Sequence, residues 1–500
     1  MSNSQPSPFR MGQAQMLRTL RTCLTTGAMG LTLALAALAP ANAVDDYGLP
    51  SLTGGHQAMS SEEYRLGRAW LRQFRAQVPI WDDPISQAYV ESLMNRLLPH
   101  SGLGNMPTIV TLVDNRALNA FAVPGGVIGL NAGLFTFAEE EDAVVSVVAH
   151  ELGHLSQRHY ARGRARAEQT QMPTMAAMLA GMLIAAAGGG DAGIAAAMGS
   201  QAAFIQDQLT YSRRFEQEAD RLGLQTMAQA GFDPGAMARM FHAMQRQVSL
   251  QGGNPPEFLL THPMTEGRIN DAEARAAQLT PAPLREVDDP SYHLIRARAL
   301  LQVHQRDPQQ AATRLAQDQA PDVARRYLDA LIAAYRGQTD AALNQLEAVA
   351  RELPDLAILP VSAAEVAFKA GRYDDAIERS RRVLRLMPGH MPATRILGEA
   401  LLQRDPDAAY RILRELAEQR PEDPQVFTLL AAAAGRSGRE AWGHLARAEQ
   451  MQLTGDIQRA IRQLGVARQV AEQSGDSNAA ARIEQRREAF IGYRETLEQF

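Results

Sequence analysis

Apolar and charged positions alternate at helical spacing along residues 60–100. Pro79 and Pro84 interrupt this pattern, which therefore predicts two amphipathic helices instead of one. The β-branched run Thr108–Val113 comes next and predicts a short strand. We expect the folded part of the chain to begin with two helices that lead into a sheet.

The stretch between residues 119 and 162 predicts a turn, a strand and a central helix. Pro124-Gly125-Gly126 separates two apolar runs, which predicts a turn that leads into an edge strand at Val127–Leu130. From Glu139 to about Arg162 the chain has no proline and carries apolar residues on more than one helical face. That pattern is typical of a long helix buried in the middle of a domain.

Residues 172–205 are rich in Met, Ala and Gly and carry a single charge, Asp191. The longest apolar run within them, Met175–Ala187, is too short to cross a bilayer. Three interpretations stay open: a core helix, a lid over a cleft, or a segment in peripheral contact with a membrane. Flexible methionine side chains suit an adaptable apolar surface.

The C-terminal 200 residues repeat with a period of 34 residues, which separates Gly337 from Gly371 and Pro354 from Pro388. The unit at 371–390 resembles the second half of a tetratricopeptide repeat, and 393–403 resembles the first half. A repeat of this kind is a helix–turn–helix pair whose neighbours stack into a solenoid. Such an array binds peptides or partner proteins and does not by itself imply catalysis.

The N-terminus has the features of a secretory signal. Arg10, Arg18 and Arg21 precede the apolar run Leu24–Leu38, and Ala41-Asn42-Ala43 offers a cleavage site. A membrane anchor is the alternative, but the apolar run is short for one. The signal predicts export to a periplasm.

These patterns divide the chain into three parts. Residues 1–43 are the expected signal peptide, and proline and acidic residues at 278–290 mark a boundary. We therefore expect a first domain at 44–285, which contains the candidate chemistry described below, and a tetratricopeptide-repeat domain at 290–490.

The amino-acid composition excludes several kinds of functional site. The single cysteine among 500 residues, Cys23, excludes a disulfide framework and a cysteine-rich metal site. A net charge of −5 argues against a nucleic-acid-binding protein. Histidine and carboxylate side chains are left as the residues that could hold a metal.

The central predicted helix contains His150-Glu151-Leu152-Gly153-His154. A spacing of four residues places both imidazoles on one helical face, where they can bind one zinc ion. Glu151 is then placed to act as general base on a water bound to that ion. Gly153 is costly inside a helix, and the close approach of another part of the chain or of the metal would explain it.

A catalytic zinc site needs a third protein ligand. The segment Phe215-Glu216-Gln217-Glu218-Ala219-Asp220, near a predicted helix start at Tyr211, offers two glutamates between which the pattern alone cannot choose. His159 is a further candidate ligand, but it lies five residues beyond His154 and off the ligand face, which favours a structural role or a contact behind a ligand.

The motifs HELGH, FEQEAD and NAFAVPGG…NAGL together resemble the gluzincin metallopeptidases of the CAAX-prenyl-protease and HtpX type. The resemblance implies that Glu216 is the third zinc ligand and that Asp220 has a catalytic supporting or proton-donating role. It leaves Glu218 as a surface or salt-bridge residue. It also implies that Val127, Ile128, Gly129 and Leu130 form a strand that binds substrate by backbone pairing.

The combination of signal, protease and repeats is similar to that of the periplasmic members of this family. That similarity implies that His262, within Thr261-His262-Pro263, is a fourth, removable zinc ligand that keeps the enzyme latent. The expected fold is mainly α, with an α+β metallopeptidase domain followed by an α-helical solenoid.

The implied function is that of a periplasmic zinc metalloendopeptidase with a chaperone-like role in outer-membrane β-barrel assembly and in degradation of misassembled proteins. Its expected partners are outer-membrane proteins and their assembly machinery, bound through the repeats. The alternative is a repeat-based chaperone or adaptor whose protease site is mainly latent. A processing enzyme for small lipidated peptides is a third interpretation, and the lack of a membrane-embedded chamber counts against it.

Overall fold

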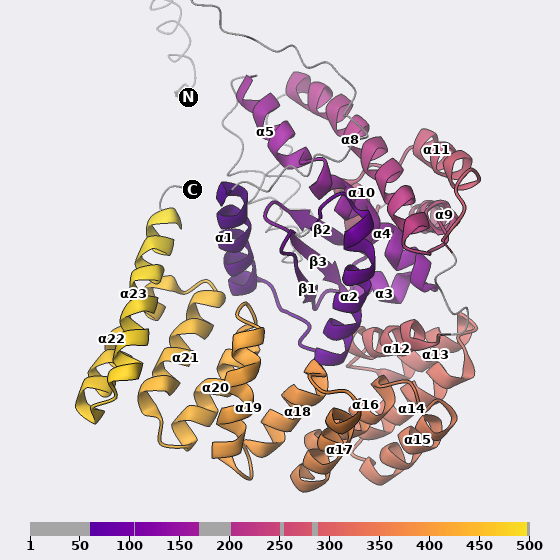
Figure 1. The fold of residues 1–500 in the computed structure, drawn as a ribbon. Helices are drawn as coiled ribbons and strands as arrows, with labels where there is room; N and C mark the ends of the chain where they lie inside the picture. Colours follow the sequence, from indigo (N-terminus) through magenta and orange to yellow (C-terminus); the bar gives the residue numbers. More distant parts are fainter. Residues whose placement is uncertain (1–60, 105, 170–201, 251–254, 283–288, 498–500) are drawn as a thin grey trace, which may run out of the picture. The chain divides into compact units, whose positions relative to one another are not determined.

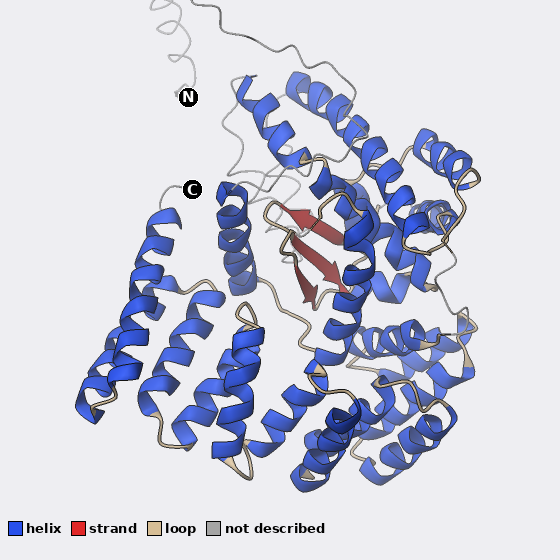
Figure 2. Ribbon diagram, in the orientation of Figure 1, coloured by secondary structure: helices blue, strands red, loops and turns tan. Residues whose placement is uncertain are grey.

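The computed structural model describes residues 61–104, 106–169, 202–250, 255–282 and 289–497. The expected signal peptide and residues 172–201 lie outside these ranges. Within them, helices dominate and a single small sheet is present (Figure 2). The predicted fold class, a mainly helical protein in which a small α+β domain precedes repeat helices, is confirmed.

The two predicted N-terminal helices are present as α1 (Ser61–Gln77) and α2 (Pro84–Leu97), followed by the short 3-10 helix η1 (Leu98–His100). Pro84 occupies the first turn of α2, where its missing N–H costs no hydrogen bond. Asp83 caps the helix by accepting hydrogen bonds from the backbone N–H groups of Ile85 and Ser86.

The sheet has three strands in the order β1-β3-β2. Strand β1 (Ile109–Val113) runs parallel to β3 (Val127–Asn131), and β2 (Ala120–Val123) runs antiparallel to β3. The predicted strand at Val127–Leu130 is therefore real, but its prediction as an edge strand is wrong. It is the central strand, and all five of its residues are buried.

The helices that follow the sheet along the chain include α4, which carries the HELGH motif and contacts β2 (Figure 1). They are α3 (Ala132–Phe137), α4 (Glu141–Ser156), α5 (His159–Gln169), α8 (Ala202–Gln229), α9 (Gly235–Leu250), α10 (Glu257–Thr261) and α11 (Glu266–Ala276). The helix expected from Glu139 to Arg162 is broken into α4 and α5, because Arg158 adopts the left-handed conformation with φ of 51°. The helix expected to start near Tyr211 begins earlier, at Ala202.

Antiparallel helix pairs follow from residue 291 to the end of the described chain. They are α12 (Ser291–Val303), α13 (Pro308–Gln317), α14 (Asp322–Tyr335), α15 (Thr339–Glu352), α16 (Ile358–Lys369), α17 (Tyr373–Leu386), α18 (Met391–Leu401), α19 (Pro406–Gln419), α20 (Pro424–Arg436), α21 (Glu440–Leu453), α22 (Ile457–Ser474) and α23 (Ser477–Leu497). Gly337 and Gly371 occupy equivalent turns with φ of 77° and 74°, which explains why glycine recurs there.

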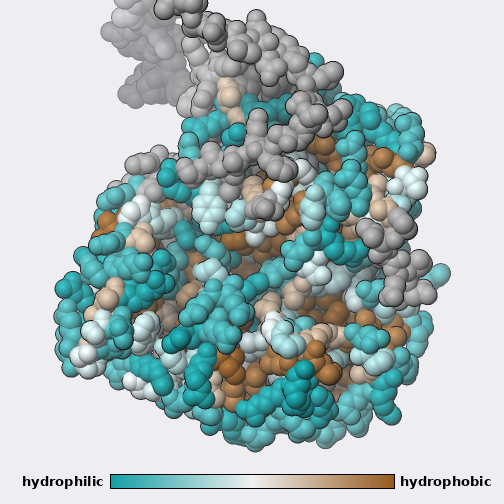
Figure 3. All heavy atoms as spheres, in the orientation of Figure 1, coloured by the Kyte–Doolittle hydropathy of each residue, from teal (hydrophilic) through white to brown (hydrophobic). Residues whose placement is uncertain are grey.

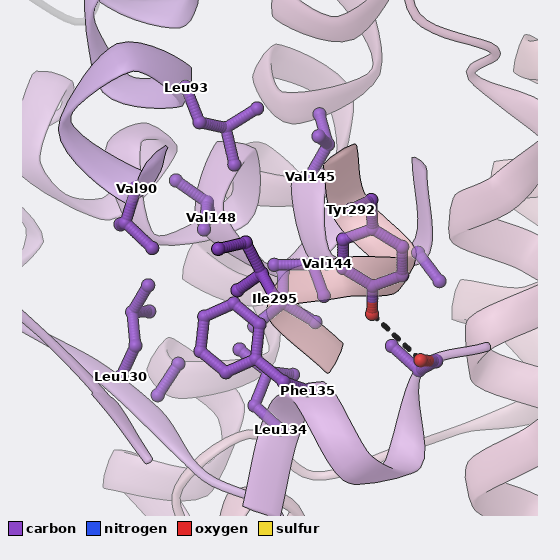
Figure 4. Packing of buried hydrophobic residues seen from close by; sticks show 14 of the residues in the cluster. Val90, Leu93, Leu130, Leu134, Phe135, Val144, Val145, Val148, Tyr292 and Ile295 are labelled. Carbon is purple, nitrogen blue, oxygen red and sulfur yellow. Dashed lines mark hydrogen bonds between the residues drawn. The ribbon is translucent and has the colours of Figure 1, made fainter. Parts of the chain in front are cut away.

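The core around α4 also takes side chains from the first repeat helices (Figure 4). Val144 and Val148 of α4 pack with Phe135 and with Ile295 of α12 in one buried cluster. Within it, the Tyr292 hydroxyl donates a hydrogen bond to the carbonyl oxygen of Ala138 at 2.7 Å. The boundary predicted near residue 285 stays a prediction, and this core extends across it.

Hydrophilic residues cover most of the face shown in Figure 3, and hydrophobic residues appear in smaller areas between them. Among the described helices, none is both long and apolar enough to span a lipid bilayer.

Candidate metal centre

Helix α4 presents His150 and His154 one turn apart, as the spacing predicts. Their rings meet edge to face with centroids 4.6 Å apart, and their Nε2 atoms are 3.0 Å apart. His150 is buried and His154 is partly buried. The two imidazoles therefore direct the same ring nitrogen to a common point.

Helix α8 brings Glu216 to that point. Its Oε1 lies 3.3 Å from His154 Nε2 and its Oε2 lies 3.4 Å from His150 Nε2. The helices can approach this closely because Gly153 has no Cβ atom. An added Cβ would lie only 2.8 Å from the carbonyl oxygen of Ala219 on α8. The glycine that looked unfavourable inside a helix is thus explained by the close approach of another part of the chain.

His262, the residue directly after α10, is the fourth member of the group. Its Nδ1 lies 3.3 Å from His150 Nε2 and 3.2 Å from Glu216 Oε2. The ring stacks on Phe258, with centroids 4.5 Å apart. Phe258, which the sequence did not single out, thereby fixes the plane of the His262 ring.

These donors fit a tetrahedral metal ion. One donor atom from each of His150, His154, Glu216 and His262 lies within 4.8 Å of the others. The close pairs are 3.0 to 3.4 Å apart, and ligands at about 2.0–2.1 Å from a tetrahedral zinc ion are about 3.3–3.4 Å from one another. Three imidazoles and one carboxylate are also the ligand types that zinc takes.

Two of the four donors, His154 and Glu216, are in the protonation state that a metal ligand needs. Burial lowers the pKa of His154 to about 3, which keeps its ring neutral. Burial opposes ionisation of Glu216, but the three surrounding histidines outweigh it and hold the pKa well below its usual range. The site thus offers an ionised carboxylate.

Glu151 lies beside the donors without belonging to them. It is 1% exposed, and its Oε1 lies 3.4 Å from His262 Nε2. That oxygen accepts no hydrogen bond from any described residue. A buried carboxylate oxygen without a donor is costly unless water, substrate or a metal ligand serves it.

Comparison with known proteins agrees with this geometry. Residues 84–276 match the model of peptidase family M48, and residues 367–433 match a tetratricopeptide-repeat model. The beta-barrel assembly-enhancing protease of Escherichia coli strain K12 is 30% identical over 92% of this chain and 93% of its own. A Vibrio cholerae protein is 33% identical over 89% of this chain and 94% of its own.

The chain belongs to the family of the beta-barrel assembly-enhancing proteases, within peptidase family M48. The resemblance inferred from the motifs is confirmed, and so is the class of enzyme, a metallopeptidase. The mitochondrial metalloendopeptidase OMA1 of Schizosaccharomyces pombe is more distant, at 28% identity over 37% of this chain and 51% of its own.

In this M48 peptidase Asp220 lies behind a ligand, away from the point where the donors meet. Its Oδ1 is 2.8 Å from His150 Nδ1, the ring nitrogen opposite the one that faces the donors. Arg268 donates to both of its oxygens, at 2.7 and 2.8 Å. Despite burial, these contacts hold the pKa of Asp220 below its usual range. Asp220 is therefore placed to orient His150, which fits the supporting role expected of it, and its proton-donating role stays a prediction.

Arg268 was missed by the sequence analysis. It lies on α11, is 2% exposed, and also reaches Glu216 Oε2 at 3.0 Å. A single arginine six residues beyond His262 gives no periodic or motif signal. Only the fold shows that it pairs with both Glu216 and Asp220 of α8.

His159 and Glu218 are also placed by the fold. His159 Nδ1 lies 2.8 Å from His154 Nδ1, so of the two roles left open for it the contact behind a ligand is the one observed. Glu218 pairs with His159 at 3.0 Å and with Arg162 at 2.9 Å, as expected of a salt-bridge residue.

The sheet of this M48 peptidase corrects the expected substrate strand. Val127, Ile128, Gly129 and Leu130 pair with β1 on one side and with β2 on the other, so β3 has no free backbone edge for a peptide. On β2 the side away from β3 pairs with no other described strand. The signal for an edge strand came from Pro124-Gly125-Gly126, which forms the tight turn between β2 and β3.

Proposed function

We propose that this chain is a zinc metalloendopeptidase of the periplasm that acts on outer-membrane β-barrel proteins during their assembly and degrades those that misassemble. The observation that carries the proposal is the convergence of His150, His154, Glu216 and His262 beside the buried carboxylate of Glu151.

In this proposal His150, His154 and Glu216 hold zinc, and His262 is a fourth ligand that must leave for catalysis. Zinc bound there would lower the pKa of a water molecule to about 7 and polarise the scissile carbonyl. Glu151 accepts the proton of the attacking water on Oε1 and delivers it to the leaving amine nitrogen. Asp220 and Arg268 hold His150 in the ring orientation that directs Nε2 to the metal.

Substrate backbone would pair with β2, Ala120–Val123, whose outer side has no partner strand among the described residues. Strand addition supplies affinity through main-chain hydrogen bonds and accepts many sequences. That is the recognition an enzyme needs if it removes unfolded proteins of varied sequence. Helix α4, which carries the HELGH motif, contacts β2, and this proximity supports the proposal.

The cellular role rests on the named relatives and on the repeats. Proteins called beta-barrel assembly-enhancing proteases match this chain over nine-tenths of its length, and tetratricopeptide repeats bind protein partners. The expected signal at 1–43 supports the periplasm. Peripheral membrane contact through 172–205 stays a prediction that lies mostly outside the described residues.

Glu151→Gln tests the enzymatic role. We expect the variant to retain one zinc ion per chain and to lose cleavage of casein or of an unfolded outer-membrane protein by at least about a hundredfold, because amide nitrogen and oxygen cannot take up the proton. Glu273→Gln, on the exposed face of α11, is the matched control and should cleave normally.

Retention of cleavage by Glu151→Gln would reject the assignment. The same variant also separates the alternative function. If the protein acts as a chaperone or adaptor, Glu151→Gln should still restore outer-membrane assembly in cells that lack the wild-type protein. If it acts through cleavage, the variant should fail to restore assembly.

A further inference from the structure

His159 reaches a metal ligand only because the helix that carries HELGH is interrupted. Arg158 has φ of 51° and is one of two non-glycine residues with positive φ among those described. In an unbroken helix a residue five positions beyond His154 would point to a different face. The left-handed residue lies between the two helices, so that His159 begins α5 and its Nδ1 lies 2.8 Å from His154 Nδ1. Strained backbone of this kind is retained where function requires it.

The hydrogen atoms of this contact can be assigned from the ring chemistry. A neutral imidazole that binds a metal through Nε2 carries its proton on Nδ1. His154 Nδ1–H must then donate to His159 Nδ1, which leaves the proton of His159 on Nε2. Glu218 Oε2 lies 3.0 Å from that Nε2 and accepts its hydrogen bond. In this series of hydrogen bonds from His154 to Glu218, every donor therefore has one acceptor.

Two further contacts hold Glu218 and His159, the residues of this series that lie farthest from the metal site. Arg162 donates to Glu218 at 2.9 Å. Phe215 stacks on the His159 ring with centroids 4.2 Å apart and an interplanar angle of 15°. His159 is 5% exposed, whereas the side chain of Arg162 is 44% exposed. The contacts therefore lead from the metal site to the surface between α5 and α8.

We propose that His159 is a positioning residue for the metal, which fixes the tautomer and ring orientation of His154 and is itself fixed by Glu218. The proposal rests on the metal-binding function proposed above. It gives each histidine of HELGH its own partner: the buried pair of Asp220 and Arg268 for His150, and the partly exposed pair of His159 and Glu218 for His154. Only the second depends on the contact between α5 and α8, the helices on either side of residues 170–201.

The test measures metal affinity by competition with a chromogenic zinc chelator, using the whole chain. His159→Phe keeps the ring and its stacking on Phe215 but removes both hydrogen bonds, and we expect zinc binding to weaken 10- to 100-fold. His159→Asn places an amide oxygen near the position of Nδ1 and should recover part of that loss. His242→Phe removes another histidine–glutamate pair, on α9 and α11, and should bind zinc as the wild type does.

A second readout reports the ligand geometry directly. The visible absorption of the cobalt-substituted protein should shift in His159→Phe and not in His242→Phe, because only the first lets the His154 ring rotate. If His159→Phe does not fold, Glu218→Gln replaces it, with an expected several-fold loss of zinc affinity.

Zinc affinity within twofold of wild type in the folded His159→Phe chain, with an unchanged cobalt spectrum, would overturn the proposal while leaving the metal site intact. Failure of the wild-type chain to bind one zinc ion would instead overturn the proposed function, and this inference with it.

Discussion

Among single residues, His262 has the position that matters most for activity, because it contacts both the metal donors and Glu151, the proposed general base. Its Nδ1 faces the donors and its Nε2 lies 3.4 Å from Glu151 Oε1. One ring thus fills the fourth donor position and stands next to the carboxylate that should act as base. Water could not occupy that position, nor a substrate carbonyl, while the ring remains there.

His262→Ala should therefore raise basal proteolysis. Removal of the fourth donor leaves His150, His154 and Glu216 to hold the metal and opens a position for water, the arrangement typical of catalytic zinc sites. We expect casein cleavage to rise several-fold at unchanged zinc content, with His242→Ala as the control. Equal or lower activity in a variant that still binds zinc would show that His262 does not restrain the enzyme.

The local residues of the site could be predicted, and their distant partners could not. HELGH is contiguous, so its geometry follows from the helical repeat alone. Arg268 and the pairing of His159 with His154 depend on how α11 packs and on one left-handed residue, Arg158, which no periodicity encodes.

At the scale of elements, the joint between α4 and α8 assembles the site. Gly153 allows the backbone of α8 to approach at Ala219, and Gly223 allows α4 to approach at Ala149, where an added Cβ would lie 3.2 Å from the carbonyl carbon. Glu216 and Asp220 are one turn apart on α8, so both reach α4 at once. The separation of the two helices therefore sets the separation of the metal donors.

Gly153→Ala should lower both stability and zinc affinity, although alanine favours a helix by about 1 kcal/mol over glycine. The new methyl group would meet the Ala219 backbone at 2.8 Å, and overpacking of this kind costs about 1–3 kcal/mol. Thermal unfolding and chelator competition measure the two effects. Gly163→Ala on α5, where the nearest atom would lie 3.9 Å away, is the control and should be neutral or stabilising.

The periodicity of the sequence predicted where helices and strands occur, but not which of them lie next to one another. Both N-terminal helices and the repeat helices follow from apolar spacing and from proline and glycine at their ends. The order of the strands does not, because a two-sided apolar pattern at Val127–Leu130 fits a buried central strand as well as an edge strand. Here the parallel partner β1 decided the matter.

For the whole molecule, buried and partly buried ion pairs join the helices before the sheet to the repeats. Arg298 of α12 is 6% exposed and donates to Asp83 at 2.6 Å and to Glu365 of α16 at 2.7 Å. Arg395 of α18 makes a two-pronged contact with Asp82 at 2.6 Å for each bond. Asp83 caps α2, so the repeats hold the start of that helix in place.

Arg298→Ala should strongly destabilise the chain, because it leaves two buried carboxylates without their shared cation, a change that costs about 3–5 kcal/mol. Burial opposes ionisation of Glu365, but Arg298 and Lys369 lower its pKa to about 2. The stabilisation it provides is therefore present above pH 4.5 and lost as the pH falls toward 2.

Without Arg298 that carboxyl would take up a proton at higher pH, so the deficit of the variant should shrink between pH 7 and pH 4. Urea unfolding at both values measures this, with Arg326→Ala, an arginine in an exposed pair with Glu352, as the control. A deficit that stays constant or grows on acidification would contradict the role given to Arg298.

The core shared by α4 and the repeats bears on how the chain is made. Tyr292, Ile295, Val361 and Ile396 belong to the same buried cluster as Val144 and Val148. A chain that folds from its N-terminus as it emerges cannot close this cluster at residue 276, where the M48 match ends. About 120 further residues must follow first. The growing chain therefore reaches residue 396 before its peptidase core can close, which delays a competent protease until about half of its own repeat helices are present.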